Sequence, residues 1–234
     1  APSGSGVGID VLNDANNAVK DLALRGSTVI FKGASAETLR IDSSGRLLLG
    51  TTTEGHADAD DFTIGTSTNS AGITIRTNTS GTGRLWFSDG TSGDAEYQGY
   101  IQYDHNNQIL SLGSGGSTRL RIDSSGRVLI GHNSSLAIGG GDISPLQVSA
   151  TSAVVFGGVR YVNSSSGPFL SLSKSRATTA GSNTIVQSGD DLGTILFSGD
   201  DGTDLISKGA QIQGQVDGTP GSNDMPGRLV FSTT

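Results

Sequence analysis

Apolar and polar residues alternate in short runs along most of the chain after residue 26. Clusters of Gly, Ser, Thr, Asn and Asp separate these runs, a pattern typical of short strands joined by turns. We therefore predict an all-β fold after this point. The clearest predicted strands are Ser27–Phe31, Gly72–Arg76, Ile109–Leu112, Val154–Tyr161 and Phe169–Ser173.

Helical periodicity is confined to the first part of the chain, where Asp10 or Asn13 could cap a short helix. Its apolar positions recur three and four residues apart: Leu12, Ala15, Val19 and Leu22. This is the single narrow seam of a short coiled coil. Such a helix is too short to be stable alone, so we expect three copies to pack together. A single amphipathic helix lying on its own chain is the alternative.

An internal repeat is the strongest signal in the sequence. The segment Leu39–Gly50 recurs as Leu120–Gly131, and only two positions change. Val128 replaces Leu47 and Ile130 replaces Leu49, so both positions stay apolar. A weaker echo relates the segments Gly83–Ser88, Gly193–Ser198 and Gly227–Ser232.

The repeated segment predicts a β-hairpin whose register can be chosen from its residues. A three-residue loop, Ser43-Ser44-Gly45, places Asp42 opposite Arg46 and Ile41 opposite Leu47. It gathers apolar side chains on one face, as strand alternation requires, whereas a two-residue loop mixes apolar and charged side chains on both faces. Such loops commonly end with a left-handed residue, so we predict positive φ at Gly45.

The same register applies to the second copy, with Asp123 opposite Arg127 and positive φ at Gly126. We also predict that Ile41 and Ile122 are buried against other strands or other chains. The residues assigned this structural role are Ile41, Asp42, Gly45, Arg46, Ile122, Asp123, Gly126 and Arg127.

Composition changes the picture from one chain to several. Only 33% of the 234 residues are hydrophobic and 36 are Gly, which is too little apolar material for one thick core. Disorder fits poorly, because the net charge is only -7 and strand-like runs recur. We expect the core to be shared with identical chains, as in fibres.

Charge and cysteine usage exclude some functions. The acidic balance and scattered basic residues argue against nucleic-acid binding, and no apolar run is long enough to span a membrane. Without Cys there are no disulfides or thiolate metal sites.

The repeated hairpins, Arg40–Gly50 and Arg121–Gly131, resemble the R-I-D-S-S-G arrays in tail-fibre proteins of marine bacteriophages, especially those that infect cyanobacteria. The segments Ala71–Ile101 and Gly181–Phe231 resemble two spacers of that family. This resemblance covers roughly two thirds of the chain. It implies a virion structural role in host adhesion, with attachment to other tail proteins and contact with a host surface glycan or protein.

Three groups of residues are candidate chemical sites. His56, Asp58, Asp60 and Asp61 could ligate a metal if they converged, but a solvated linker explains them better. The segment Asp200–Asp204 is similar to a calcium loop, lacks EF-hand spacing, and is favoured as a turn.

A glycan depolymerase would need paired carboxylates and sugar-stacking aromatic residues. Candidates are Asp89, Asp94, Glu96 and Asp104, with Trp86, Tyr97, Tyr100 and Tyr103. The aromatic residues are better explained as strand-face residues. We therefore expect no catalytic residue, no metal and no cofactor.

These observations predict a fibrous, repeat-containing, intertwined all-β homotrimer with a short N-terminal helix or coiled coil. Its expected place is the extracellular tail fibre of a virion, where it would be a shaft segment that supports host recognition and adsorption. The alternatives are a bacterial surface adhesin or filament, and a tailspike-like depolymerase. The predicted parts are a leader with helix at 1–33, hairpin modules at 34–55 and 119–134, and spacers at 56–118 and 135–234. We expect the gene to continue past Thr234 into another hairpin.

Overall fold

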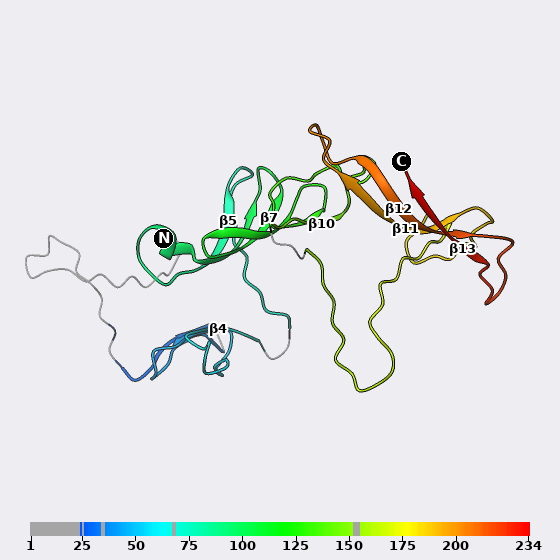
Figure 1. Ribbon diagram of the computed structural model, residues 1–234. Coiled ribbons are helices and arrows are strands. Elements are labelled where there is room, and N and C mark those ends of the chain that lie inside the picture. Colours follow the sequence, from blue (N-terminus) through cyan, green and yellow to red (C-terminus); the bar gives the residue numbers. More distant parts are fainter. Residues whose placement is uncertain (1–23, 25, 34–35, 67–68, 152–154) are drawn as a thin grey trace, which may run out of the picture. The chain divides into compact units, whose positions relative to one another are not determined.

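The computed structural model describes residues 24, 26–33, 36–66, 69–151 and 155–234. Within these ranges the protein is all-β, with one short 3-10 helix (Figure 1). The predicted fold class is therefore confirmed at this level. The predicted helix through Leu12 and Leu22 lies outside the described residues, and the division into five parts stays a prediction. The described residues fall into two compact units, one that ends at Thr74 and one from Ile75 to Thr234.

The first unit contains a sheet with the strand order β1-β2-β3-β4. Its strands are β1 (Val29–Lys32), β2 (Glu37–Ile41), β3 (Leu47–Leu49) and β4 (Phe62–Ile64). The first three strands are antiparallel neighbours, whereas β4 runs parallel to β3. A parallel neighbour needs a connection that returns along the sheet, and residues 50–61 supply it.

The second unit contains a six-stranded sheet with the order β10-β9-β8-β7-β6-β5. Its strands are β5 (Thr82–Phe87), β6 (Gly99–Asp104), β7 (Ile109–Ser114), β8 (Ser117–Ile122), β9 (Val128–Ile130) and β10 (Leu146–Val148). The 3-10 helix η1 (Gly93–Tyr97) joins β5 to β6. Again the hairpin β8–β9 is followed by a parallel strand, β10. The two repeats therefore share three strands, one more than the sequence repeat indicates.

A three-stranded antiparallel sheet completes the second unit, with the order β11-β12-β13. Its strands are β11 (Asp191–Gly199), β12 (Ser207–Val216) and β13 (Gly227–Thr233). The segments that echo each other, Gly193–Ser198 and Gly227–Ser232, lie in its two edge strands. The third echo, Gly83–Ser88, includes most of β5, which is likewise an edge strand.

Two of the five named strand predictions are confirmed and three are wrong. Ser27–Phe31 overlaps β1, and Ile109–Leu112 lies in β7. Gly72–Arg76, the described part of Val154–Tyr161, and Phe169–Ser173 are not strands. Strand propensity reflects fit to a pleated, half-buried surface, and these segments have no strand neighbour among the described residues.

The predicted hairpin register is confirmed in both copies. Leu39 pairs with Leu49, Arg40 with Leu48 and Ile41 with Leu47, and the second copy has the same pairing. Gly45 has φ +84° and Gly126 has φ +78°, as a left-handed turn residue requires. The sequence therefore encodes this turn locally.

Ile41 is predicted to be buried against other strands or other chains, and the described strands of its own chain do not bury it. Ile41 is 40% exposed, whereas Leu48, on the opposite face, is 1% exposed. The reason is the return connection to β4, which crosses the face that carries Leu48. Ile122 is only half-buried. Burial of both residues against another chain stays a prediction.

The core of the described residues is small. Its buried hydrophobic residues are Leu48, Leu129, Val186 and Val216. Two of them, Leu48 and Leu129, occupy the same position in the two hairpins. Because so few apolar side chains are buried, most of the apolar surface of the sheets is exposed in the single chain.

Candidate functional site

The predicted hairpin residues come together at each turn. The Asp42 carboxylate accepts hydrogen bonds from the Ser44 amide at 2.9 Å and the Arg46 amide at 3.0 Å. It also accepts one from Nε of Arg46 at 2.8 Å. The Arg46 guanidinium lowers the pKa of the Asp42 carboxyl below its usual value. Asp42 and Arg46 thus close the turn whose last residue is Gly45.

The second turn repeats this geometry. The Asp123 carboxylate accepts from the Ser125 amide at 2.9 Å, the Arg127 amide at 3.1 Å and Nε of Arg127 at 2.7 Å. Partial burial raises the pKa of Asp123, but the hydrogen bonds from Arg127 and Ser125 outweigh it, so the pKa lies below its usual value. Both turns have a structural role and leave no carboxylate oxygen directed at a substrate.

One face of the first sheet, which we call its open face, is apolar across all four strands. Residues opposite one another in neighbouring strands share a face, so the register defines two complete cross-strand rows. These rows are Val29-Ile41-Leu47-Phe62 and Phe31-Leu39-Leu49-Ile64. Phe31 and Phe62 are each about half exposed. The side predicted to be apolar is therefore a surface of the single chain.

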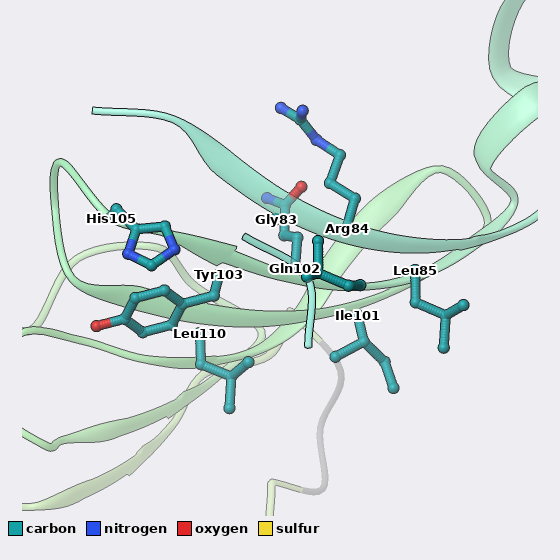
Figure 2. Close-up of a pocket in the computed structure, with 9 residues that line it drawn as sticks. Gly83, Arg84, Leu85, Ile101, Gln102, Tyr103, His105 and Leu110 are labelled. Carbon is teal, nitrogen blue, oxygen red and sulfur yellow. The ribbon is translucent and has the colours of Figure 1, made fainter. Parts of the chain in front are cut away.

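The six-stranded sheet has an open face of the same kind, with two rows that cross all six strands. One row is Gly83-Tyr103-Leu110-Ile122-Val128-Leu146, and the other is Leu85-Ile101-Leu112-Leu120-Ile130-Val148. Figure 2 shows Leu85, Ile101 and Leu110 on this side of the sheet, with Arg84 directed to the other. No charged residue belongs to either row.

The opposite faces, which we call the covered faces, carry the connections between the parallel strands. In the first sheet, Oγ1 of Thr63 accepts a hydrogen bond from the Gly55 amide at 3.1 Å. In the six-stranded sheet, the Gln147 side chain binds both the amide and the carbonyl of Leu136, at 3.0 and 2.6 Å. Thr63 pairs with Leu48 and Gln147 with Leu129. In both copies, a polar side chain at the equivalent strand position therefore forms hydrogen bonds to the connection, beside the equivalent buried leucine.

The third sheet also has an apolar face, again called its open face. Ile195, Ile212 and Phe231 form one row, and Gly193, Gly214 and Leu229 form another. A groove of about 260 Å³ on this face is lined in part by Leu170 and Leu172. Close packing of Leu172 needs Gly at position 193, because an added Cβ would lie 2.6 Å from Cβ of Leu172. Leu229 and Phe231 remain 68% and 70% exposed.

The groove drawn in Figure 2 lies on the open face of the six-stranded sheet and has a volume of about 290 Å³. Its lining is apolar apart from Arg84, Gln102, His105 and the Tyr103 hydroxyl. His105 stacks edge-on against Tyr103, with 4.9 Å between ring centroids. None of its lining residues carries a carboxylate, so the groove lacks the acid pair of a glycosidase.

Two of the candidate catalytic carboxylates, Asp94 and Asp104, form hydrogen bonds within their own turns. Asp94 accepts from the Tyr97 hydroxyl at 2.7 Å, which raises the pKa of Tyr97. Asp104 accepts from the Asn107 side-chain amide at 2.8 Å, which lowers the pKa of Asp104. Asp89 and Glu96 are exposed. These contacts stabilise turns at the two ends of β6 and bring no catalytic pair together.

The aromatic candidates are divided between the two faces of the sheet. Trp86 pairs with Tyr100 on the covered face, and its ring lies 5.6 Å from that of Tyr97. The Tyr100 hydroxyl is 2.7 Å from Oγ1 of Thr118. Tyr103 lies on the open face. The strand positions therefore divide them and give no single platform for stacking on a sugar.

The candidate metal ligands do not converge as a group of three, although Nδ1 of His56 lies 3.5 Å from the Asp58 carboxylate. Asp60 forms an ion pair with Nη1 of Arg46 at 2.8 Å, while the side chains of His56 and Asp58 are 82% and 91% exposed. In the described ranges, no three His, Cys, Asp or Glu side chains are arranged to hold a metal ion. Asp60 instead ties the return connection to the first hairpin.

The segment Asp200–Asp204 forms a turn. The Asp201 carboxylate accepts from the Thr203 amide at 2.9 Å and from the Ser207 hydroxyl at 2.6 Å. The hydrogen bond from Ser207 contributes most to lowering the pKa of Asp201. Gly202 has φ +91°. The Asp201 oxygens accept hydrogen bonds from nearby residues of the chain, which agrees with the turn predicted from the sequence.

Sequence reasoning missed Thr63, Gln147 and the two buried leucines. A signal for the leucines was present: Leu48 and Leu129 are identical in the two copies, whereas the residues on either side of them change. The flanking positions lie on the open face. Thr63 and Gln147 could not be found in this way, because the two residues differ and the connections before them differ in length.

Among the described residues, no helix has the length and apolar character needed to cross a membrane. Comparison with models of protein families gave no match. Comparison with curated proteins gave none either. The functional conclusion therefore depends on the sequence repeat and on the geometry of the open faces.

Proposed function

We propose that this chain is a shaft segment of a bacteriophage tail fibre, and that three copies bury their open faces against one another. The observation that carries the proposal is the extent of these faces, which recur on all three sheets. In this role the protein positions other parts of the fibre for host recognition and adsorption. The proposed role is structural and involves no catalytic step.

The exposed area supports an assembly rather than a monomer. On the six-stranded sheet, eight large side chains of the open face are 37% to 59% exposed: Leu85, Phe87, Ile101, Tyr103, Leu112, Ile130, Leu146 and Val148. Together they present roughly 650 Å² of surface, close to the ~800 Å² per partner of a standard interface. Monomeric proteins rarely expose apolar patches of more than a few hundred Å².

The distribution of charge supports the same arrangement. Arg40, Arg84 and Arg121 all occupy covered-face positions in the register, whereas the complete open-face rows carry no charge. An uncharged face can be buried between copies without leaving ions unpaired. The choice of three copies comes from the resemblance of the hairpins to phage-fibre arrays.

The native mass tests the assembly. Light scattering on the purified chain should give three times the chain mass of 23.8 kDa, and the value should persist on dilution. A monomer would refute the shared core. A dimer would keep the buried faces and refute the three-fold arrangement.

The genes beside the coding sequence test the virion role. Virion genes cluster, so neighbouring genes for tail structural proteins are expected. An export signal or a surface anchor in the same gene would instead support an adhesin. Release of oligosaccharides from host polysaccharide by the purified trimer would show an enzymatic activity that the proposed role does not include.

A further inference from the structure

Residues 155–173, which we call the unpaired segment, have the sequence of strands but not the pairing. Among the described residues, no backbone–backbone hydrogen bond involves this segment. Its backbone carbonyls at Ser166 and Gly167 accept hydrogen bonds from the Arg160 side chain. Figure 1 shows it as a long excursion without strand arrows, coloured green to yellow. Its side chains include the four most exposed large apolar ones of the described chain, Phe156 at 80%, Val159 at 75%, Tyr161 at 94% and Phe169 at 88%.

Apolar side chains lie on both sides of this segment. Because successive side chains of an extended chain point to opposite sides, Val159 and Tyr161 share one side and Phe156 and Val162 the other. A strand with one side in water would carry polar residues there. This pattern is typical of a strand covered on both sides, and the part of its own chain that the structure describes supplies no such cover.

The end of the segment is anchored. Leu170 and Leu172 line the groove over Gly193 and Gly214 on the open face of the third sheet. Just beyond, the Arg176 guanidinium forms two hydrogen bonds of 2.6 Å with the Asp190 carboxylate. The residues before Leu170 are therefore tethered beside this sheet but do not cover it. Leu229 and Phe231, on its edge strand β13, stay more exposed than Ile195 and Phe197 on the same face.

We propose that residues 155–168 of one copy pack on the open face of the third sheet of a second copy, over Leu229 and Phe231. This inference rests on the proposed function, because it needs an assembly of identical chains. In a cyclic assembly, such as a three-fold trimer, every copy presents the same residues at the same level along the axis. A segment tethered at its own third sheet thus meets the third sheet of its neighbour. Each copy then supplies a cover and receives one.

A photo-crosslinker at position 161 tests the exchange without requiring its detailed geometry. Tyr161 is replaced by p-benzoylphenylalanine, which keeps an aromatic ring, and the assembly is irradiated after its mass has been measured. The expected product runs at twice the chain mass on a denaturing gel. Its crosslinked peptide should contain residues of β11, β12 or β13. The same substitution at the exposed Asn107, in the β6–β7 turn, is the control and should give little product.

Two failures are distinguishable. A trimer whose crosslinks join residues of one chain, or reach a sheet other than the third, would overturn the exchange and leave the proposed function standing. A monomer by light scattering would overturn the proposed function and the exchange with it. Mixing ¹⁵N-labelled with unlabelled chains during assembly gives a second readout, since crosslinked peptides of mixed label arise only between copies.

Discussion

The two hairpin modules have the same turn, the same buried leucine and the same open face, but they hold their third strands differently. In the first, Arg46 reaches both Asp42 and Asp60, and Thr63 makes one hydrogen bond to the connection. In the second, Arg127 pairs with Asp123, and Gln147 binds the connection through two hydrogen bonds. The hairpin is thus determined by residues of its own turn, which are the same in both copies. The return connection is held by different polar side chains in the two copies.

The largest loss of stability should come from truncating the buried leucine of either hairpin module. Leu129→Ala or Leu48→Ala removes a side chain that is 1% exposed, and each should lower the free energy of unfolding by about 2–4 kcal/mol per chain. Equal losses in the two modules would show that both leucines have equivalent environments. Denaturant unfolding measures this. A loss below about 1 kcal/mol for either variant would mean that its cover is loose.

Removing the side-chain hydrogen bonds of Thr63 and Gln147 should show which return connection depends more on them. Gln147→Leu leaves the amide and the carbonyl of Leu136 without their partner, at a cost of about 1–3 kcal/mol. Thr63→Val removes a single hydrogen bond at the equivalent place and should cost less, about 1 kcal/mol. Hydrogen exchange of the Leu136 and Gly55 amides measures each effect where it arises. Equal exchange in the two variants would contradict the comparison.

The turns should respond identically in the two modules. Gly45→Ala and Gly126→Ala place a Cβ at positive φ, where no atom lies within 4 Å. The cost is therefore conformational, on the order of 1 kcal/mol per chain. Thermal unfolding of both variants should show matching shifts. A stability equal to that of the unchanged chain would mean that the turn relaxes to another conformation.

Acid should weaken both turns. The pKa of Asp42 and of Asp123 is lowered in the folded state, so each carboxylate stabilises the fold above its unfolded pKa of about 4. That contribution is lost as pH falls through the lower, folded pKa. NMR titration of the two carboxyl groups should place both midpoints below the ordinary Asp value of about 4. A midpoint at the ordinary value would mean that the pairing with Arg is absent in solution.

The sequence predicted what is encoded locally. Asp42, Gly45 and Arg46 define a turn within five residues, and the apolar alternation then fixes the register. It did not predict β4 and β10, because their pairing depends on connections whose residues differ between the copies. It also left open whether strands of the same chain or another chain bury Ile41, since an apolar row looks the same in both cases.

The unpaired segment illustrates the same limit. Val154–Tyr161 and Phe169–Ser173 have strand-like sequences, and the described residues of both are unpaired. Propensity indicates that a residue suits a sheet, but it does not specify which chain supplies the neighbour. The predicted site residues were therefore found where the contacts are local, and the open faces emerged only from the register of all the strands.

Neighbouring residues on opposite faces of β6 give the most direct test of the shared core. Ile101→Asp places a charge on the open face, where Ile101 is 41% exposed in the single chain, so a monomer tolerates it. Gln102→Asp places the same charge on the covered face, beside Arg84 in the register. Sedimentation velocity over a dilution series should give trimers for the unchanged chain and for Gln102→Asp, and monomers for Ile101→Asp. Trimers for both variants, or monomers for all three proteins, would contradict the burial of the open faces between copies.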